Sequence, residues 1–151
     1  MNTSSVVIYT DGSCSHNNGA GGWAAIVNID GVITELSGGD TRTTSVRMEL
    51  TAIIRALQLL TTSREVVIYT DCQFIVNTVN QGRLTKWDRC KYQTTKHKLV
   101  PNHELWIQLH GLLNKHDVRL TWIKGHSGTP LNDRCDKLAK QQMKARKDKT
   151  L

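Results

Sequence analysis

Two apolar runs in the chain have the same sequence. Residues 6–11 and residues 66–71 both read Val-Val-Ile-Tyr-Thr-Asp. Runs of β-branched and aromatic residues without polar interruption are typical of central strands that are covered on both faces. We therefore expect two buried strands, each ending in an aspartate: Asp11 in the first, where Gly12 is expected to end the strand, and Asp71 in the second.

Three further strands are predicted from apolar alternation and turn residues. Residues 22–29 and 32–36 are expected to pair as a hairpin, because Asp30-Gly31 between them is a strong signal for a tight turn. Residues 118–123 alternate between apolar and polar side chains and are expected to form a last strand, followed by a glycine-flanked loop.

Apolar residues at helical spacing predict a long helix over residues 46–60 and another over residues 102–114. Thr44 and Ser45 are both candidates for the N-cap of the first of these helices. A shorter helix is expected around Phe74, between the second apolar run and the basic segment described next.

The second half of the chain contains two basic segments. Residues 82–98 are polar, basic and weakly periodic, which indicates a protrusion or a surface helix. A last helix is expected to begin at Thr129-Pro130, because proline at the first helical position lacks an N–H that would be unpaired there anyway. Residues 144–151 are expected to be a frayed basic tail.

This order of elements predicts an α/β fold in which an antiparallel meander is followed by parallel crossovers. The 151 residues suit one domain, and no linker divides residues 1–151. No apolar run approaches the ~18 residues of a membrane span, and the first residues lack the pattern of a signal peptide. We therefore expect a cytoplasmic protein that has no membrane partner.

Charge is distributed unevenly along the chain. The net charge is +7, but residues 1–82 contain 4 Lys/Arg and 7 Asp/Glu, whereas residues 83–151 contain 16 Lys/Arg and 6 Asp/Glu. A basic region beside a more acidic one suggests that a polyanion is gripped by one part of the surface and acted on by another. Nucleic acid is the expected partner, although such a charge can also serve solubility alone.

Three carboxylates are expected to meet at one edge of the sheet. If the two identical strands are parallel neighbours, Asp11 and Asp71 lie side by side at the edge where ligands bind in open α/β sheets. Glu49 begins the apolar stripe of the first long helix and therefore faces the sheet. The alternatives are that the aspartates only begin turns and that Glu49 only complements the helix dipole.

The last helix offers a fourth carboxylate. Asp136 lies on the flank of the buried stripe formed by Leu131, Cys135, Leu138 and Ala139, and spacing alone does not favour it over Asp133. His126 stands in a glycine-flanked loop, where a neutral imidazole could transfer a proton near pH 7 or could be an inert surface residue.

Carboxylates without sulfur or imidazole partners favour Mg²⁺, with Mn²⁺ as a substitute. None of the four cysteines has the spacing of a zinc site. Two such ions at a carboxylate cluster are suited to phosphodiester hydrolysis. A nucleotide-binding P-loop is absent from the sequence, which argues against an NTPase.

Six motifs, in order along almost the whole chain, resemble bacterial-type ribonucleases H of type 1. They are Tyr-Thr-Asp-Gly-Ser-Cys at 9–14, Gly-Gly-Trp-Ala at 21–24, Thr-Thr-Ser-Val-Arg-Met-Glu-Leu at 43–50, Tyr-Thr-Asp-Cys-Gln at 69–73, Trp-Ile-Lys-Gly-His-Ser-Gly at 122–128 and Asn-Asp-Arg-Cys-Asp-Lys-Leu-Ala at 132–139. The resemblance implies a three-layer fold with a five-stranded mixed sheet flanked by helices. It also implies a monomeric endoribonuclease that hydrolyses the RNA strand of RNA–DNA hybrids with two Mg²⁺ ions and leaves a 5′-phosphate.

The resemblance also assigns roles to residues. It implies that the metal ligands are Asp11, Glu49, Asp71 and Asp136, and it thereby selects Asp136 over Asp133. It places His126 at the family's mobile histidine, which handles protons and product release.

Substrate contacts are implied at positions that match the family. Polar residues facing the minor groove would be Asn17 and Gln73, and the pocket for a DNA-strand phosphate would be Arg42, Thr44 and Asn102. The chain departs from many relatives at Ser45-Val46, where Ser45 can still hydrogen-bond and the Val46 side chain cannot, so recognition of the 2′-OH there must use backbone or be weaker. The basic protrusion keeps the charges Arg83, Lys86, Arg89, Lys91, Lys96 and Lys98 but has only Trp87 and Tyr92 as aromatics.

Two other functions are compatible with this pattern. A non-catalytic duplex-binding module on the same fold is disfavoured because all four carboxylates and His126 are present. Another two-metal nuclease of the same superfamily is disfavoured by Gln73 and by the residues around His126.

Overall fold

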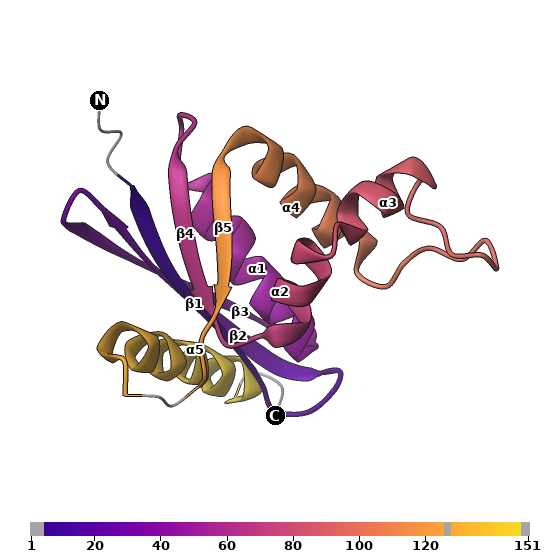
Figure 1. Ribbon diagram of the computed structural model, residues 1–151. Helices are drawn as coiled ribbons and strands as arrows, with labels where there is room; N and C mark the ends of the chain where they lie inside the picture. Colours follow the sequence, from indigo (N-terminus) through magenta and orange to yellow (C-terminus); the bar gives the residue numbers. More distant parts are fainter. Residues whose placement is uncertain (1–4, 126–127, 149–151) are drawn as a thin grey trace.

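A five-stranded mixed sheet with helices on both faces forms the molecule (Figure 1). The computed structural model describes residues 5–125 and 128–148. The strands are β1 (Val6–Cys14), β2 (Gly19–Ile29), β3 (Val32–Thr43), β4 (Glu65–Thr70) and β5 (Asp117–Trp122), and the sheet order is β3-β2-β1-β4-β5. The helices are α1 (Ser45–Gln58), α2 (Gln73–Asn80), α3 (Arg83–Arg89), α4 (His103–Lys115) and α5 (Pro130–Asp148). The predicted α/β fold is confirmed.

The two identical sequences pair in parallel and in register at the centre of the sheet. Val6 of β1 is opposite Val66 of β4, and Tyr9 is opposite Tyr69. The two tyrosine rings stack with centroids 5.1 Å apart and an interplanar angle of 23°. This pairing confirms that the duplicated strands are parallel neighbours. It brings their carboxyl ends to the same edge of the sheet.

The core lies between the sheet and α1, with α4 beyond it. Ile8 of β1, Ile53 and Leu57 of α1, and Leu109 of α4 have no exposed surface. Helix α5 covers the opposite face of the sheet (Figure 1). There the buried Cys135 thiol donates a hydrogen bond to the Tyr9 carbonyl at 3.2 Å. The sheet is thus covered on both faces, as its uninterrupted apolar central strands predict.

Three strands run further than their sequences predict, and one of them is β2, which begins at Gly19 rather than at Gly22. β1 continues through Gly12 to Cys14, and β3 continues past Leu36 to Thr43, because both remain paired with β2 over these residues. The added segments, rich in glycine and serine, lack the alternation of apolar and polar residues that marks a strand. The prediction that Gly12 ends the first strand is therefore wrong, and Asp11 lies inside β1 rather than in a turn.

Helix α5 also differs from expectation. Residues 144–148 were expected to fray but are helical, and α5 ends at Asp148. The aliphatic part of the Arg146 side chain packs over Gly39 of β3, so this basic segment has a surface to lie on. Residues 149–151 lie outside the described part of the chain.

The basic segment at 82–98 is both a helix and a protrusion. Helix α3 and the loop after it project from the body of the molecule (Figure 1). Trp87 of α3 is held edge-on against Trp106 of α4, with ring centroids 5.6 Å apart. Tyr92, in the loop, is buried and lies 6.1 Å from the Trp87 ring. Among the described helices, none combines the length and apolar character needed to cross a membrane.

Candidate active site

Three carboxylates converge where β1, β4 and α1 meet. Asp71 directly follows the last residue of β4, Asp11 is in β1, and Glu49 is in the second turn of α1. One carboxylate oxygen from each residue lies within 4.8 Å of the other two. Asp11 and Glu49 are 4% and 7% exposed. The sequence prediction that these three side chains meet is confirmed.

Gly12 allows β1 and α1 to approach this closely. A Cβ atom at Gly12 would lie 2.7 Å from the backbone nitrogen of Glu49, which is too short for a real contact. The Gly12 N–H also donates to Asp11 Oδ1 at 2.8 Å. The glycine after Asp11 is therefore needed because α1 packs closely on it, and it does not form a turn. It places the Glu49 carboxylate beside Asp11.

Burial and mutual repulsion raise the pKa values of the cluster. Burial, followed by the charge of Asp71, raises the pKa of Asp11 to about 7. Burial and the charges of Asp11 and Asp71 hold the pKa of Glu49 well above its usual range. Like charges at this distance oppose ionisation unless a cation neutralises them. The cluster is therefore electrostatically unfavourable by itself.

The donor set fits a hard divalent cation. Glu49 Oε2 is buried, and no hydrogen-bond partner for it exists among residues 5–125 and 128–148. A buried carboxylate oxygen without a partner is costly, and a coordinated cation would supply what it lacks. All three side chains offer oxygen, which is the ligand that Mg²⁺ and Mn²⁺ prefer.

The raised pKa values make a prediction for the metal-free protein. A carboxyl whose pKa is higher in the folded state binds protons more tightly when folded, so its contribution to stability falls as pH rises. For Asp11 this loss spans the interval from its unfolded pKa of about 4 to its folded pKa of about 7. With divalent ions chelated, we expect Asp11→Asn to raise the free energy of unfolding by about 1–3 kcal/mol at pH 8.

Denaturant unfolding with a chelator at pH 5 and pH 8 measures this effect. The gain from Asp11→Asn should be smaller at pH 5 and should shrink when Mg²⁺ is restored. Asp133→Asn, an exposed carboxylate on α5, is the matched control and should change little at either pH. An Asp11→Asn variant less stable than the parent at pH 8 would contradict the repulsion argument.

Asp136 lies beside this cluster rather than in it. Its charge and its hydrogen bonding contribute to the raised pKa of Asp11, so its carboxylate faces that residue. Asp136 Oδ2 also pairs with Lys140 Nζ at 3.1 Å, one turn further along α5. A spacing of four residues is typical of such an ion pair on a helix. Asp133 is exposed.

His126 lies outside the described residues. The residue before it, Gly125, is described and lies against the carboxylate cluster. A Cβ atom at Gly125 would lie 2.8 Å from Asp71 Oδ2, so the backbone there packs on the carboxylate. The indole N–H of Trp122 donates to the Asp71 carbonyl at 3.2 Å. This contact of Trp122 could not be predicted from the sequence, because neither charge nor periodicity marks an exposed indole as a donor to a backbone carbonyl.

Polar residues surround the cluster on separate elements. Asn17 is exposed in the loop between β1 and β2, and Gln73 is exposed at the first residue of α2, two positions after Asp71. Ser45 is the exposed first residue of α1, and Val46 is half-buried against the core. The Val46 side chain therefore packs inward instead of facing solvent.

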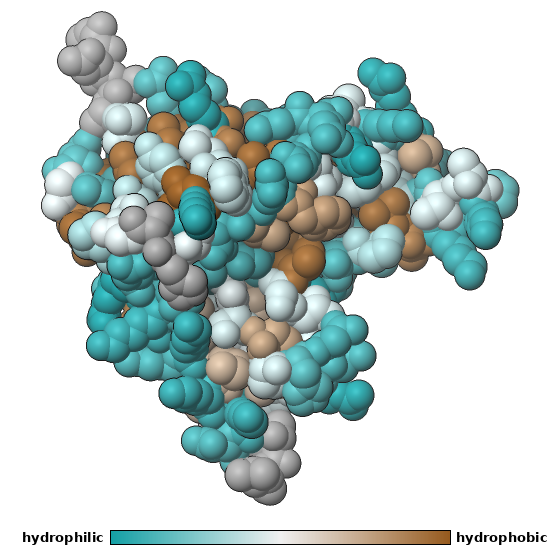
Figure 2. Space-filling model, turned by 60° about the horizontal axis from the view of Figure 1, so that its bottom comes forward, coloured by the Kyte–Doolittle hydropathy of each residue, from teal (hydrophilic) through white to brown (hydrophobic). Residues whose placement is uncertain are grey.

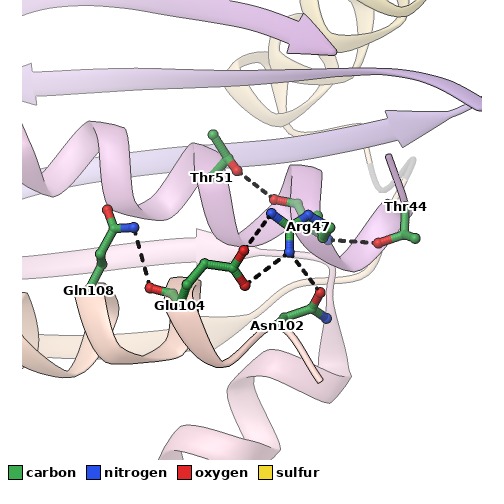
Figure 3. Close-up of polar contacts among 6 residues, drawn as sticks. All are labelled: Thr44, Arg47, Thr51, Asn102, Glu104 and Gln108. Carbon is green, nitrogen blue, oxygen red and sulfur yellow. Dashed lines mark hydrogen bonds and ion pairs between the residues drawn. The ribbon is translucent and has the colours of Figure 1, made fainter. Parts of the chain in front are cut away.

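The three residues expected to hold a DNA-strand phosphate lie near the starts of two helices, α1 and α4. Thr44 is the N-cap of α1, and its Oγ1 accepts from the Arg47 N–H at 3.3 Å, so of the two N-cap candidates it is Thr44 that caps the helix. Asn102 is the N-cap of α4, and Arg42 is exposed near the end of β3. The guanidinium of Arg47 contacts Asn102 (Figure 3), a link that sequence analysis missed.

Basic residues of the protrusion are exposed. Lys86, Arg89 and Lys91 point their charge to solvent, and Lys86 and Trp87 line a hollow of about 350 Å³. Figure 2 views the molecule from the side of the carboxyl ends of the parallel strands. Hydrophilic side chains cover most of that face, and the outline is hollowed where the protrusion projects.

Comparison with known proteins agrees with this architecture. A family model described as RNase H matches residues 3–144. A ribonuclease H of Nitratidesulfovibrio vulgaris is 46% identical over 146 residues, which are 97% of this chain and 94% of the relative. A ribonuclease H of Chlorobium chlorochromatii is 45% identical, covering 92% of this chain and 95% of the relative.

Solved structures show the same fold. LC9-RNase H1, a type 1 RNase H, aligns with a TM-score of 0.83 and 24% identity over 97% of this chain and 75% of the other. LC11-RNase H1, solved in complex with an RNA/DNA hybrid, aligns with a TM-score of 0.70 and 23% identity over 93% of this chain and 97% of the other. Fold, carboxylate cluster and relatives agree, and the chain belongs to the ribonuclease H family.

Proposed function

We propose that this protein is a divalent-metal-dependent endoribonuclease that hydrolyses the RNA strand of RNA–DNA hybrids. The observation that carries the proposal is the cluster of Asp11, Glu49 and Asp71, whose oxygens lie within 4.8 Å of one another. Its raised pKa values support a site built for cations, as does the Glu49 oxygen that lacks a hydrogen-bond partner in the described part of the chain. One relative of the same fold was solved with an RNA/DNA hybrid.

The proposed cofactor is a pair of Mg²⁺ ions, for which Mn²⁺ can substitute. Asp11, Glu49 and Asp71 would hold them, with Asp136 as the fourth ligand. When bound, two such ions activate water and stabilise the leaving oxygen of an in-line phosphodiester displacement, here leaving a 5′-phosphate. All four carboxylates belong to one chain, so the proposed active form is a monomer.

His126 is proposed to move the proton that hydrolysis transfers. The argument rests on the adjacent Gly125, whose backbone packs against the Asp71 carboxylate and so starts the loop beside the cluster. An imidazole titrates near neutral pH and is suited to proton transfer at a site of this kind.

Recognition of the hybrid is proposed to begin in the minor groove. Asn17 and Gln73 have exposed amide side chains on the loop after β1 and at the start of α2. Both can donate to and accept from base edges and the 2′-OH, which distinguishes RNA from DNA. Ser45 can contribute its hydroxyl, whereas Val46 packs on the core and contributes no polar group.

Two phosphate-binding regions complete the proposed substrate interface. Arg42, Thr44 and Asn102 would hold a phosphate of the DNA strand, where the starts of α1 and α4 favour an anion. Lys86, Trp87, Arg89 and Lys91 would hold the backbone on the protrusion, which projects from the body of the molecule (Figure 1).

A cleavage assay with three labelled duplexes tests the function. RNA–DNA hybrid, duplex RNA and duplex DNA of one sequence are incubated with the protein, with Mg²⁺ or with a chelator. We expect cleavage of the hybrid alone, only with Mg²⁺, and RNA products that a 5′-phosphate-dependent exonuclease degrades.

Each alternative gives a different result. A non-catalytic duplex-binding module would shift the mobility of the hybrid without cutting it. Another two-metal nuclease of the superfamily would cut duplex DNA or duplex RNA as well. Either result would overturn the proposal.

A further inference from the structure

Arg47 joins the amino-terminal ends of α1 and α4 (Figure 3). Its Nη1 donates to Asn102 Oδ1 at 3.1 Å and to Glu104 Oε1 at 3.1 Å. Its Nη2 donates to Glu104 Oε2 at 3.0 Å. One guanidinium therefore holds a forked contact with a carboxylate and a contact with the N-cap side chain of α4.

These contacts fix the orientation of the Asn102 amide. A guanidinium has donors and no acceptor, so the amide must turn its oxygen toward Arg47 and its NH₂ group away. Figure 3 shows the Asn102 nitrogen on the side away from the guanidinium. The amide therefore presents two N–H donors outward.

The backbone conformation and capping of Asn102 agree with an amide that is held by Arg47. An asparagine at an N-cap ordinarily accepts a hydrogen bond from its own helix, but Asn102 makes no such bond. Its φ of 63° lies in the left-handed region, which asparagine tolerates better than most residues. The side chain is thus committed to Arg47 at the expense of capping α4.

Arg47 also fixes Thr44, through its backbone. The Arg47 N–H donates to Thr44 Oγ1 at 3.3 Å, so the hydroxyl oxygen faces the helix and its proton is left for another acceptor. The N-cap residues of two helices, α1 and α4, therefore each keep a donor for a ligand, and only the donor of Asn102 is oriented by the Arg47 side chain. Helix amino-terminal ends with outward donors are ready-made sites for a phosphate.

Glu104 pairs with the Arg47 guanidinium and so limits what else this side chain can bind. The forked contact occupies one edge of the guanidinium and neutralises its charge, and the same contact holds the pKa of Glu104 below its usual range. Arg47 is 34% exposed at its side chain, with its two Nη atoms turned to Glu104 and Asn102. An arginine used in this way orients a neighbour rather than binding the anion.

We propose that Arg47 is a positioning residue, which aims the Asn102 amide N–H groups at a phosphate of the DNA strand. The proposal rests on the proposed function. It adds the group that makes the Asn102 amide present its N–H donors, rather than its oxygen, to the phosphate. Removing Arg47 frees the amide to rotate or to cap α4, so its donors no longer point at the phosphate.

The test uses hybrids in which one DNA-strand phosphate at a time is replaced by an uncharged methylphosphonate. For the parent protein, we expect a replacement at one linkage to raise KM about tenfold, the loss of one charge-assisted contact. Arg47→Met keeps the aliphatic length and removes all donors. We expect it to raise KM about tenfold on unmodified hybrid, to keep kcat within about twofold, and to lose sensitivity to that linkage.

Three further variants complete the design. Asn102→Ala should lose the same linkage sensitivity, and the Arg47→Met, Asn102→Ala double variant should be no worse than either single variant. Arg134→Ala is the matched control, because it breaks a similar pair with Glu35, at 2.8 Å and 3.1 Å, between α5 and β3. It should keep both KM and the linkage sensitivity.

The readout separates positioning from a structural role. The ratio of KM values for modified and unmodified hybrid is independent of how much of a preparation is folded. If Arg47 only holds α1 against α4, Arg47→Met lowers Tm but keeps the parent's linkage sensitivity, and the proposal is overturned. If Asn102→Ala keeps that sensitivity, the proposal also fails, while hybrid cleavage by the parent leaves the proposed function standing.

Discussion

Replacing Asp71 with asparagine is expected to lower the rate of hybrid cleavage by roughly 10³-fold or more at saturating Mg²⁺. Asparagine keeps the size of the side chain but removes one negative charge from three carboxylates that lie within 4.8 Å of one another. The remaining oxygens cannot balance two divalent cations. Trp122 contacts the backbone of Asp71 and Gly125 packs on its side chain, so the local fold should persist.

Single-turnover cleavage of labelled hybrid, with Tm as the check on folding, measures this loss. The matched comparison is on α5, where Asp136→Asn should slow cleavage and Asp133→Asn should not. Of these two carboxylates on α5, Asp136 contributes to the raised pKa of Asp11, whereas Asp133 is exposed. Near-normal cleavage by Asp71→Asn would refute the metal site, and a loss with Asp133→Asn equal to that with Asp136→Asn would refute the choice of the fourth ligand.

The centre of the fold and the carboxylate cluster could be predicted because both depend on strong local patterns. The repeated Val-Val-Ile-Tyr-Thr-Asp sequence specifies two buried strands, and parallel pairing in register brings Asp11 and Asp71 to one edge. The apolar stripe of α1 carries Glu49 to the same edge. Burial of a carboxylate against a sheet is unfavourable without a cation, so the pattern itself indicated a metal site.

Other features depend on contacts that the local sequence does not encode. The extension of β3 to Thr43 comes from pairing with β2, through residues of low strand propensity. Asp11 lies inside a strand because the partner strand β2 continues beyond it. The link from Arg47 to Asn102 joins residues 55 positions apart, and no spacing rule predicts a contact of that range.

The protrusion gives the second large expected effect, because its charges lie apart from the carboxylates. Helix α3 and the loop after it extend from the body, and their anchor is Trp87 against Trp106. The carboxylate cluster repels phosphates until cations bind. Most of the affinity for a polyanion should therefore come from exposed cations such as Lys86, Arg89 and Lys91.

Replacing these three cations together by alanine is expected to raise KM roughly tenfold or more at ~0.1 M salt. Each neutralised phosphate contributes roughly −0.9 to the slope of log affinity against log salt, so this slope should flatten by about 2–3 units. The turnover rate at saturating hybrid should change little, because contacts to the backbone position the duplex and leave the reacting bond to the carboxylates.

The control variant replaces Lys115 and Arg119 by alanine. These are two exposed cations, one at the end of α4 and one in β5. It lowers the net charge by two without touching the protrusion, and its slope should change by less than about one unit. A general effect of net charge would instead flatten both slopes in proportion to the charges removed. If the triple variant keeps its KM and its salt slope, the protrusion is only a solvated surface, and its aromatic anchor serves packing between α3 and α4 alone.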